Sequence, residues 1–224
     1  MSFPETLRVG IHFELICPWC FISKRQFERA REDFARHFPA VAVATNWHPV
    51  QLLPGLPEQG LPFKEFYEQR LGSAQAVRRR QQQVLQAATR AGLEMDFSVI
   101  RRMPNTRHAH ALLRQVAVTE EPERYEALLE CLYSAHFQRG EDIGDLATLR
   151  SLAMETGISA EDFPQGKTAV AAATTAAAAI EGVPYYDFGE GISLSGAHEP
   201  EVLLTAMKLA MHANTQPDLQ EPGT

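Results

Sequence analysis

Hydrophobic and polar residues alternate near the start of the chain and then change to helical spacing. From residue 8 to residue 16 every second side chain is apolar, which is the pattern of a strand with one buried face. Apolar residues recur at helical intervals from Phe21 to Phe38, and Pro39 ends that helix. Residues 41–49 have the pattern of a second strand. The chain is therefore predicted to open with a strand–helix–strand unit, the crossover that consecutive parallel strands require.

The middle of the chain has a different character. Residues 51–62 form a connector rich in proline and glycine, and the block from 63 to 180 is helical in pattern almost throughout. The predicted helices are Phe63–Leu71, Ser73–Ala91, Asn105–Thr119, Pro122–Arg139, Asp145–Glu155 and Gly166–Ile180. N-caps are predicted at Ser73, at Asn105 or Thr106, and at Asp145, and helix ends at Gly92, Gly140 and Gly157.

Strand character returns near the C-terminus. Two short strands at 182–188 and 192–195 flank a Gly-Glu-Gly turn, and Glu199–Ala213 is predicted to be a final helix. These patterns predict one α/β domain interrupted by a large all-helical insertion. The α/β domain is expected to comprise residues 1–58 and 181–224, and the helical insertion residues 59–180.

Composition narrows the function classes. The chain has 224 residues, of which 45% are hydrophobic, and a formal net charge of −7. This charge disfavours nucleic-acid binding, and no apolar run approaches the roughly 20 residues needed to cross a bilayer. The first residues lack the basic and apolar segments of a secretory leader. We therefore expect a cytoplasmic protein that binds neither nucleic acid nor a membrane.

Three cysteines carry the strongest chemical signal. Cys17 and Cys20 form a CxxC motif at the start of a predicted helix, and Cys131 lies alone among leucines. In a reducing compartment a CxxC pair indicates redox chemistry or half of a zinc site. No second CxxC and no HxxxH accompanies it, so redox chemistry is favoured and no metal is expected. Cys131 is predicted to be a buried apolar filler.

Position in the helix predicts a role for each residue of the motif. Cys17 lies at the helix N-terminus, where unpaired N–H groups and the helix dipole stabilise a thiolate, the attacking species in disulfide exchange. Cys20 lies one turn further in, is better shielded, and suits the role of resolving thiol. Pro18 suits the first turn, where a missing N–H costs nothing. Trp19 is expected to cover the disulfide and to offer an apolar contact to a partner.

Two other elements are candidates to support the cysteines. Glu14 lies on the strand that leads into Cys17; if buried it would relay the proton of the second thiol, and if exposed it is an ordinary strand carboxylate. Both interpretations stay open, as they do for His12. Val183 and Pro184 open a later strand, where either a cis bond that turns the Val183 backbone sideways or an ordinary trans turn is compatible with the sequence.

Asn105, Thr106, His108 and His110 form a second polar cluster, at the start of a predicted helix. Asn105 and Thr106 suit helix capping, and the two histidines do not share a helix face, so they are poor joint metal ligands. The basic run Arg78–Arg80 is predicted to be a solvated helix face.

Four segments of the sequence together carry a resemblance. They are Phe-Glu-Leu-Ile-Cys17-Pro-Trp-Cys20-Phe-Ile-Ser-Lys, Arg102-Met-Pro-Asn-Thr-Arg-His-Ala-His110, Gly182-Val-Pro184 and Leu194-Ser-Gly-Ala. In this order, between Val9 and Met211, they resemble the DsbA-family oxidoreductases of the FrnE type. The resemblance implies a thioredoxin-like fold with an inserted helical domain, a cis-Pro184 facing the cysteine pair, and thiol–disulfide oxidoreductase or isomerase activity. It also implies Cys17 as the nucleophile and Cys20 as the resolving thiol.

Two features depart from that family. The acid buried beneath the cysteines in many thioredoxin-like proteins lies earlier on the strand, near Ile11 in this sequence. Periplasmic members carry a leader, and none is seen here, so a periplasmic oxidative-folding role is not expected.

The same superfamily provides an alternative function. Kappa-type glutathione transferases and 2-hydroxychromene-2-carboxylate isomerases resemble this chain in the helical insertion and the Val-Pro element, but have Ser where Cys17 stands. A glutathione-dependent isomerase or transferase is therefore the alternative prediction, and a non-catalytic accessory module with a vestigial CxxC is a third.

The substrate is expected in a groove between the two parts of the molecule, near Cys17, Trp19 and Val183. Asn105, Thr106 and His108 are the candidate lining residues of that groove. The partner is expected to be a thiol or disulfide on a protein or a small molecule, with glutathione as a possible co-substrate and no other cofactor. Either a monomer or a homodimer is compatible with the sequence.

Overall fold

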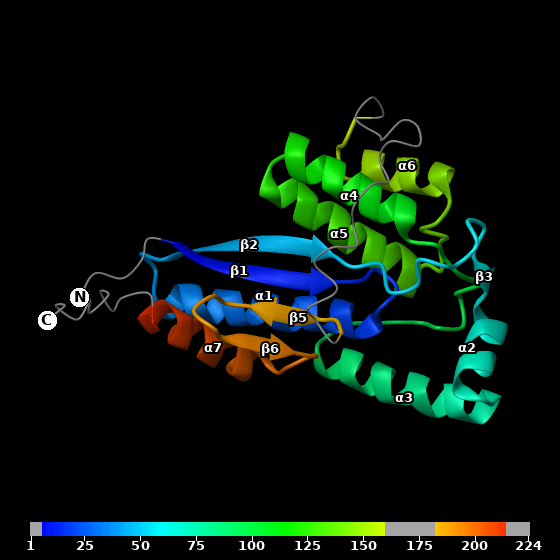
Figure 1. The fold of residues 1–224 in the computed structure, drawn as a ribbon, viewed down its shortest axis with the longest axis horizontal. Coiled ribbons are helices and arrows are strands. Elements are labelled where there is room, and N and C mark those ends of the chain that lie inside the picture. The colour runs from blue at the N-terminus through cyan, green and yellow to red at the C-terminus, as the bar shows by residue number, and fades with distance from the viewer. Residues whose placement is uncertain (1–5, 160–181, 214–224) are drawn as a thin grey trace, which may run out of the picture.

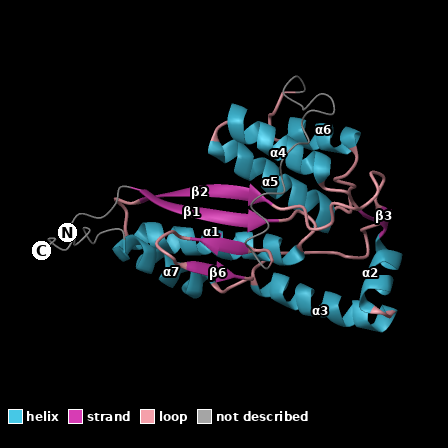
Figure 2. Ribbon diagram, viewed as in Figure 1, coloured by secondary structure: helices cyan, strands magenta, loops and turns pink. Residues whose placement is uncertain are grey.

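A computed structural model describes residues 6–159 and 182–213 of the chain. Its elements, in chain order, are β1 (Thr6–Phe13), α1 (Pro18–His37), β2 (Ala42–Pro49), β3 (Leu61–Pro62), α2 (Phe63–Leu71), α3 (Ala74–Arg90), β4 (Arg102–Met103), α4 (Arg107–Thr119), α5 (Pro122–Phe137), α6 (Leu146–Glu155), β5 (Tyr185–Asp187), β6 (Ser193–Ser195) and α7 (Pro200–Ala213). Helices predominate, and the strands gather in one sheet apart from a short pair (Figure 2).

The main sheet joins the two ends of the chain. Its strand order is β2-β1-β5-β6, with β1 and β2 parallel and the other neighbours antiparallel. Phe13 at the end of β1 lies opposite Pro49 of β2, and Ile11 lies opposite Tyr186 of β5. The strand–helix–strand opening and the C-terminal hairpin predicted from the sequence therefore lie side by side in one sheet (Figure 1).

Helices α1 and α7 pack together and cover one face of this sheet (Figure 1). The alternation in β1 explains the packing, because Leu7, Val9 and Ile11 are buried and point toward the helices. Phe27 and Phe34 of α1 close the same core. The predicted amphipathic pattern is thus realised as a sheet–helix layer that holds the start of α1 in place.

The remaining helices surround a second apolar core. Helices α4, α5 and α6 pack beside the β2 edge of the sheet, and α2 and α3 form a hairpin near the start of α1 (Figure 1). This second core contains Leu112, Leu128 and Leu132, together with the side chains of Cys17 and Cys20. The cysteine motif therefore lies where the helical block meets the sheet.

The fold class predicted from the sequence, α/β with a helical insertion, is confirmed, with two local corrections. Strand β1 ends at Phe13, so residues 14–16 form a turn and not the end of the strand. The block predicted to be all helical also contains β4, which pairs antiparallel with β3 of the connector. Because its partner strand β3 lies about forty residues earlier in the chain, no local sequence pattern predicts β4. The predicted helix at 166–180 lies outside the described residues. No helix in the described ranges has the length and apolar character of a membrane span.

Candidate active site

Cys17 is the N-cap residue of α1. Its backbone is extended, with φ −91° and ψ 107°, and its carbonyl accepts hydrogen bonds from the N–H groups of Cys20 and Phe21 at 3.0 and 3.4 Å. Pro18 occupies the first turn, where its missing N–H leaves no bond unmade. The Cys17 thiol thus lies at the positive end of a 20-residue helix.

Cys20 lies one turn into α1 and is buried. Burial raises the pKa of the Cys20 thiol well above its usual range, and a hydrogen bond to Cys17 and the negative charge at Cys17 act in the same direction. Both cysteines are free thiols in this structure. The pair is therefore unequal, with a protonated inner thiol and an outer one at the helix terminus.

A segment from the other end of the chain completes the surroundings of Cys17. The Val183–Pro184 peptide bond is cis, as predicted. The Cys17 Sγ lies 3.8 Å from the carbonyl oxygen of Val183, to which it donates a weak hydrogen bond. The Pro184 carbonyl accepts from the Gly196 N–H at 2.7 Å, which ties this segment to the end of β6. Two residues 166 positions apart are thereby brought into contact.

Glu14 is completely buried in the turn between β1 and Cys17, so the exposed-carboxylate interpretation is wrong. One carboxylate oxygen accepts from the Leu15 N–H at 2.7 Å and from His110 Nε2 at 2.8 Å. The other accepts from the Leu52 N–H at 2.9 Å and from the Thr106 hydroxyl at 3.3 Å. Its main-chain carbonyl accepts from the Cys17 N–H at 3.1 Å. All four acceptor sites of the carboxylate are filled by the protein.

The polar cluster at the start of α4 serves this buried network and the neighbouring connector. Thr106 and His110 contact Glu14, and both are buried. Asn105 donates to the Leu56 carbonyl at 2.6 Å, and its side-chain oxygen accepts from Gln51 and from the Arg107 N–H.

His108 pairs with Glu58 of the connector, at 3.5 Å. The three groove candidates Asn105, Thr106 and His108 therefore contact the connector and the turn before Cys17. His12, the other undecided position, stacks on His48 of β2 with ring centroids 4.7 Å apart.

A cavity of about 400 Å³ opens directly beside Cys17. It is lined by Ile16, Cys17, Pro18, Trp19, Leu52, Leu53, Phe63, Phe66, Tyr67, Arg70, Leu71, Val77, Arg80, Gln81, Val84, Phe97 and Met103. The predicted neighbours Pro18 and Trp19 belong to this lining, whereas Asn105, Thr106 and His108 do not. Most of its far wall comes from helices α2 and α3.

The wall from α2 and α3 is what the sequence analysis missed. Phe63, Phe66 and Arg70 follow i, i+3, i+7 spacing along α2, a helix face that could have been found from the sequence. Arg78–Arg80 are exposed, as predicted, and Arg80 also lies over the ring of Trp19 with its guanidinium carbon 5.5 Å from the centroid. Trp19 thus forms a wall of the cavity and is covered by a cation.

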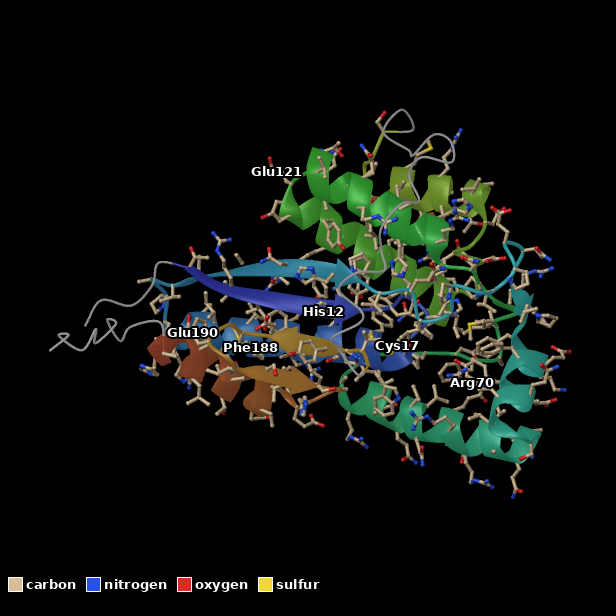
Figure 3. The ribbon with its side chains drawn as sticks, viewed as in Figure 1. His12, Cys17, Arg70, Glu121, Phe188 and Glu190 are labelled. Carbon is tan, nitrogen blue, oxygen red and sulfur yellow. The ribbon has the colours of Figure 1, made fainter. Side chains whose placement is uncertain are left out.

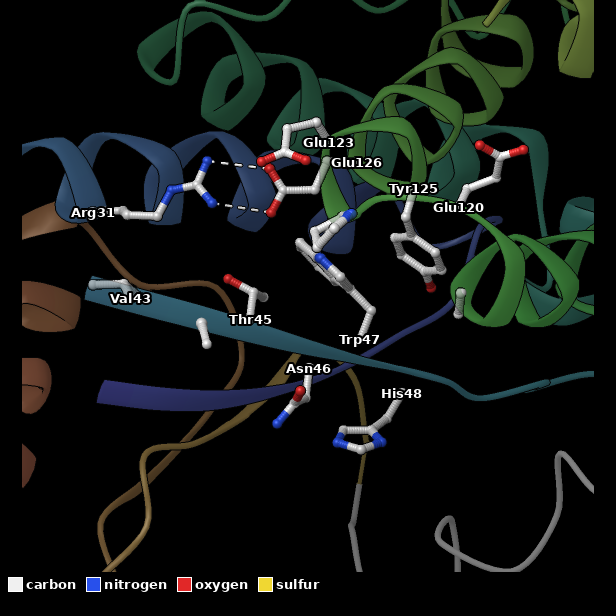
Figure 4. A pocket seen from close by; sticks show the side chains of 13 residues that line it. Arg31, Val43, Thr45, Asn46, Trp47, His48, Glu120, Glu123, Tyr125 and Glu126 are labelled. Carbon is white, nitrogen blue, oxygen red and sulfur yellow. Dashed lines mark hydrogen bonds and ion pairs between the residues drawn. The ribbon is translucent and has the colours of Figure 1, made fainter. Parts of the chain in front are cut away.

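A larger cavity, of about 750 Å³, lies elsewhere along β2. Figure 4 shows Thr45 and Trp47 of β2 on one side of it, with Glu126 of α5 and its ion pair to Arg31 on the other. No thiol lines this cavity. The smaller cavity is therefore the one relevant to cysteine chemistry.

Cys131 does not occupy the environment predicted for it. Leu128, Leu129 and Leu132 take the fully buried positions of α5, and Cys131 lies at their rim, partly exposed. Its thiol donates to a carboxylate oxygen of Glu155 at 3.6 Å and lies 4.0 Å from an Arg139 nitrogen. Burial raises the pKa of the Cys131 thiol despite the opposing effect of Arg139.

Among the residues that the structure describes, no three His, Cys, Asp or Glu side chains form a group able to hold a metal.

Comparison with protein families matches residues 8–208 to the DSBA-like thioredoxin domain. The chain belongs to this family. The match spans the strands at both ends of the chain and the helices between them, so the thioredoxin-like fold with a helical insertion is confirmed, as is the resemblance to DsbA-family oxidoreductases. The narrower FrnE type stays a prediction.

Solved structures with the same fold differ in the activity their names report. A probable DsbA oxidoreductase of Streptomyces coelicolor has a TM-score of 0.76 and 24% identity, covering 97% of this chain and 94% of its own. The cytosolic disulfide reductase DsbM of Pseudomonas aeruginosa has a TM-score of 0.63 and 14% identity, with 92% and 100% covered. A 2-hydroxychromene-2-carboxylate isomerase has a TM-score of 0.60 and 14% identity, with 93% and 98% covered. Because one fold serves several chemistries, the choice of activity rests on the site itself.

Proposed function

We propose that this DsbA-family protein is a thiol–disulfide oxidoreductase that uses Cys17 as the nucleophile and Cys20 as the resolving thiol. The observation that carries the proposal is the unequal pair of free thiols. Cys17 caps the N-terminus of α1 at the edge of a cavity, and Cys20 is buried one turn behind it with a raised pKa. An isomerase that only binds glutathione needs neither a second thiol nor this asymmetry.

The proposed exchange proceeds in two displacements. The Cys17 thiolate attacks one sulfur of a substrate disulfide; the substrate S–S bond breaks, and the departing thiolate takes up a proton. The Cys20 thiol then loses its proton and attacks Cys17 Sγ, which forms the Cys17–Cys20 disulfide and releases the second substrate thiol. Two electrons pass from the protein dithiol to the substrate, and the reverse sequence reduces the protein.

Glu14 is proposed to position the nucleophile and not to relay protons. Its carboxylate already accepts four hydrogen bonds, so no lone pair is left for the proton of Cys20. Its main-chain carbonyl holds the Cys17 N–H. The network from Glu14 to Thr106 and His110 thus fixes the turn that carries Cys17 against the helical block.

Glutathione is a candidate co-substrate. DsbM, which shares this fold, has been solved with GSH. The cavity beside Cys17 has room for a small thiol compound. A glutathione-dependent isomerase or transferase remains the competing function, and one experiment separates the two.

The experiment uses oxidised glutathione and the mass of the intact protein. Reduced wild type should lose two hydrogens as the internal disulfide forms. Cys20→Ser should retain one glutathionyl group, because the mixed disulfide has no intramolecular exit. Cys17→Ser should stay unmodified at the motif.

Cys131→Ser is the matched control, because it removes a thiol outside the cavity, and it should behave as wild type. Placing Cys20→Ser in the Cys131→Ser background localises any adduct to Cys17. A Cys20→Ser protein that stays unmodified, yet isomerises 2-hydroxychromene-2-carboxylate with glutathione, would contradict the oxidoreductase proposal and favour the alternative.

A further inference from the structure

We infer that Arg70 and Arg80 select the substrate of this site, and that the preferred substrate is a small disulfide bearing a carboxylate. The inference rests on the proposed function, because it concerns what Cys17 attacks. Both arginines line the cavity beside Cys17, one from α2 and one from α3. Figure 3 shows Cys17 and Arg70 at the same end of the molecule, with α2 and α3 beside the start of α1.

The two arginines and Cys17 line the same cavity, and the hydroxyl of Tyr67, one turn before Arg70, lies in the electrostatic field of all three. Burial and the negative charge at Cys17 raise the pKa of Tyr67 to about 12, while Arg70 and Arg80 oppose that rise. A negatively charged group entering beside Cys17 would therefore lie within the field of both guanidinium groups.

Neither guanidinium group forms an ion pair with a carboxylate of the described residues. Among the described residues no Asp or Glu oxygen lies within ion-pair distance of Arg70 or Arg80, whereas Arg25 and Arg31, for example, pair with carboxylates. Arg80 instead lies over Trp19 and donates weakly to Gln83 at 3.4 Å. Their charge is thus available to a ligand.

The acidic residues of α2 do not line this cavity. Glu65 and Glu68 line a neighbouring cavity instead, together with Lys64 and Arg101. The cavity beside Cys17 contains two arginines and no acid, whereas the whole chain carries a net charge of −7. The net negative charge of the whole chain would repel an anionic substrate. The two arginines beside Cys17 would attract it locally.

The rest of the lining limits the size and character of the substrate. About 400 Å³ accommodates a small molecule. Phe63 and Phe66 offer an apolar surface for the hydrocarbon part, and the planar guanidinium groups match a carboxylate in geometry. A disulfide whose carboxylate lies a few bonds from the sulfur satisfies both parts of the lining.

Three symmetric disulfides that differ in charge test the inference. Reduced protein is oxidised by 3,3′-dithiodipropionate (anionic), bis(2-hydroxyethyl) disulfide (neutral) or cystamine (cationic), and the rate is followed by tryptophan fluorescence. Each rate is divided by the rate at which the same disulfide oxidises dithiothreitol, which removes its intrinsic reactivity. We expect the anionic disulfide to react fastest and the cationic one slowest, with a preference that shrinks as salt is added.

Arginine variants assign the preference to residues. Arg70→Gln and Arg80→Gln should each reduce the normalised rate with the anionic disulfide by about 2- to 5-fold, the size expected of an exposed ion pair. The neutral disulfide reports any change in the nucleophilicity of Cys17, so the anionic-to-neutral ratio isolates substrate charge. Arg79→Gln is the matched control, because Arg79 is exposed on the same helix and does not line the cavity.

Equal normalised rates for the three disulfides would overturn the inference while leaving the oxidoreductase proposal intact. A ratio lowered as much by Arg79→Gln as by Arg70→Gln or Arg80→Gln would also overturn it. If none of the three disulfides oxidises the protein, the proposed function itself fails, and the substrate inference falls with it.

Discussion

His136 shows how one buried side chain can couple proton binding to folding. It lies near the end of α5, is 1% exposed, and packs edge-on against Phe137 with ring centroids 4.7 Å apart. Burial lowers the pKa of His136 from 6.5 to about 4, because the charged imidazolium would lose its hydration. The folded protein therefore holds this ring neutral at pH values where the unfolded chain protonates it.

The sign of the pH dependence follows from that difference. Between about pH 4 and pH 6.5 the unfolded state binds more protons at His136 than the folded state does. The stability contributed by the neutral, buried His136 ring is therefore complete above pH 6.5 and is lost as the pH falls toward 4. We expect wild type to lose about 2–3 kcal/mol more than His136→Leu between pH 7 and pH 4.5, measured by urea unfolding. Parallel curves for wild type and His136→Leu would contradict the assignment.

The end of α5 depends on a glycine that meets a distant backbone. The helix ends at Phe137, and Gly140 follows in the left-handed region with φ +69°. A Cβ at Gly140 would lie 2.4 Å from the carbonyl oxygen of Val99. Gly157, after α6, has a similar φ of +78° but nothing within 4 Å of its Cβ position. The two positions therefore share the conformational requirement and differ in the close approach.

Alanine substitution separates the two costs. Gly157→Ala should reduce the free energy of unfolding by about 1 kcal/mol, the penalty of a left-handed non-glycine residue. Gly140→Ala should cost about 2–4 kcal/mol, because the backbone must also move away from Val99. Denaturant unfolding of both variants measures the difference. Equal losses would show that the segment after α5 shifts without strain.

At the scale of the whole molecule, an ion-pair network joins α1 to α5. Lys24 of α1 is only 4% exposed and pairs with Glu28 and, at 2.7 Å, with Glu130 of α5. Arg25 pairs with Glu28 at 2.8 Å and with Glu130 at 2.5 Å. The helix that carries both cysteines is thereby held against the helical block at a point beyond the active site.

Removing the α5 partner of this network should destabilise the protein more than removing a half-buried pair. Glu130→Gln leaves the buried Lys24 with Glu28 as its remaining carboxylate, and we expect a loss of about 1–3 kcal/mol in the free energy of unfolding. Glu126→Gln, one turn earlier, removes the more exposed pair to Arg31 and should cost less than about 1 kcal/mol. Urea unfolding of both variants measures the difference, and equal losses would show that Glu28 alone pairs Lys24 adequately.

The sequence by itself determined those features that depend on neighbours along the chain. The strand and helix periods gave β1, α1, β2 and the terminal hairpin, and local caps at Ser73 and Asp145 accept the expected backbone hydrogen bonds. The CxxC at the start of α1 is also a local feature, because helix position alone distinguishes the outer thiol from the inner one. A helix N-terminus and its dipole are set by a few consecutive residues.

Only the tertiary structure decided what faces the cysteines. The burial of Glu14 depends on His110, 96 residues away, and the contact between Cys17 and Val183 spans 166 residues. The cavity wall that carries Arg70 and Arg80 likewise depends on how α2 and α3 pack near α1. A basic residue on a helix has the same local pattern whether it faces water or a nucleophile. Packing between distant segments therefore decides which of the exposed arginines line the cavity beside Cys17.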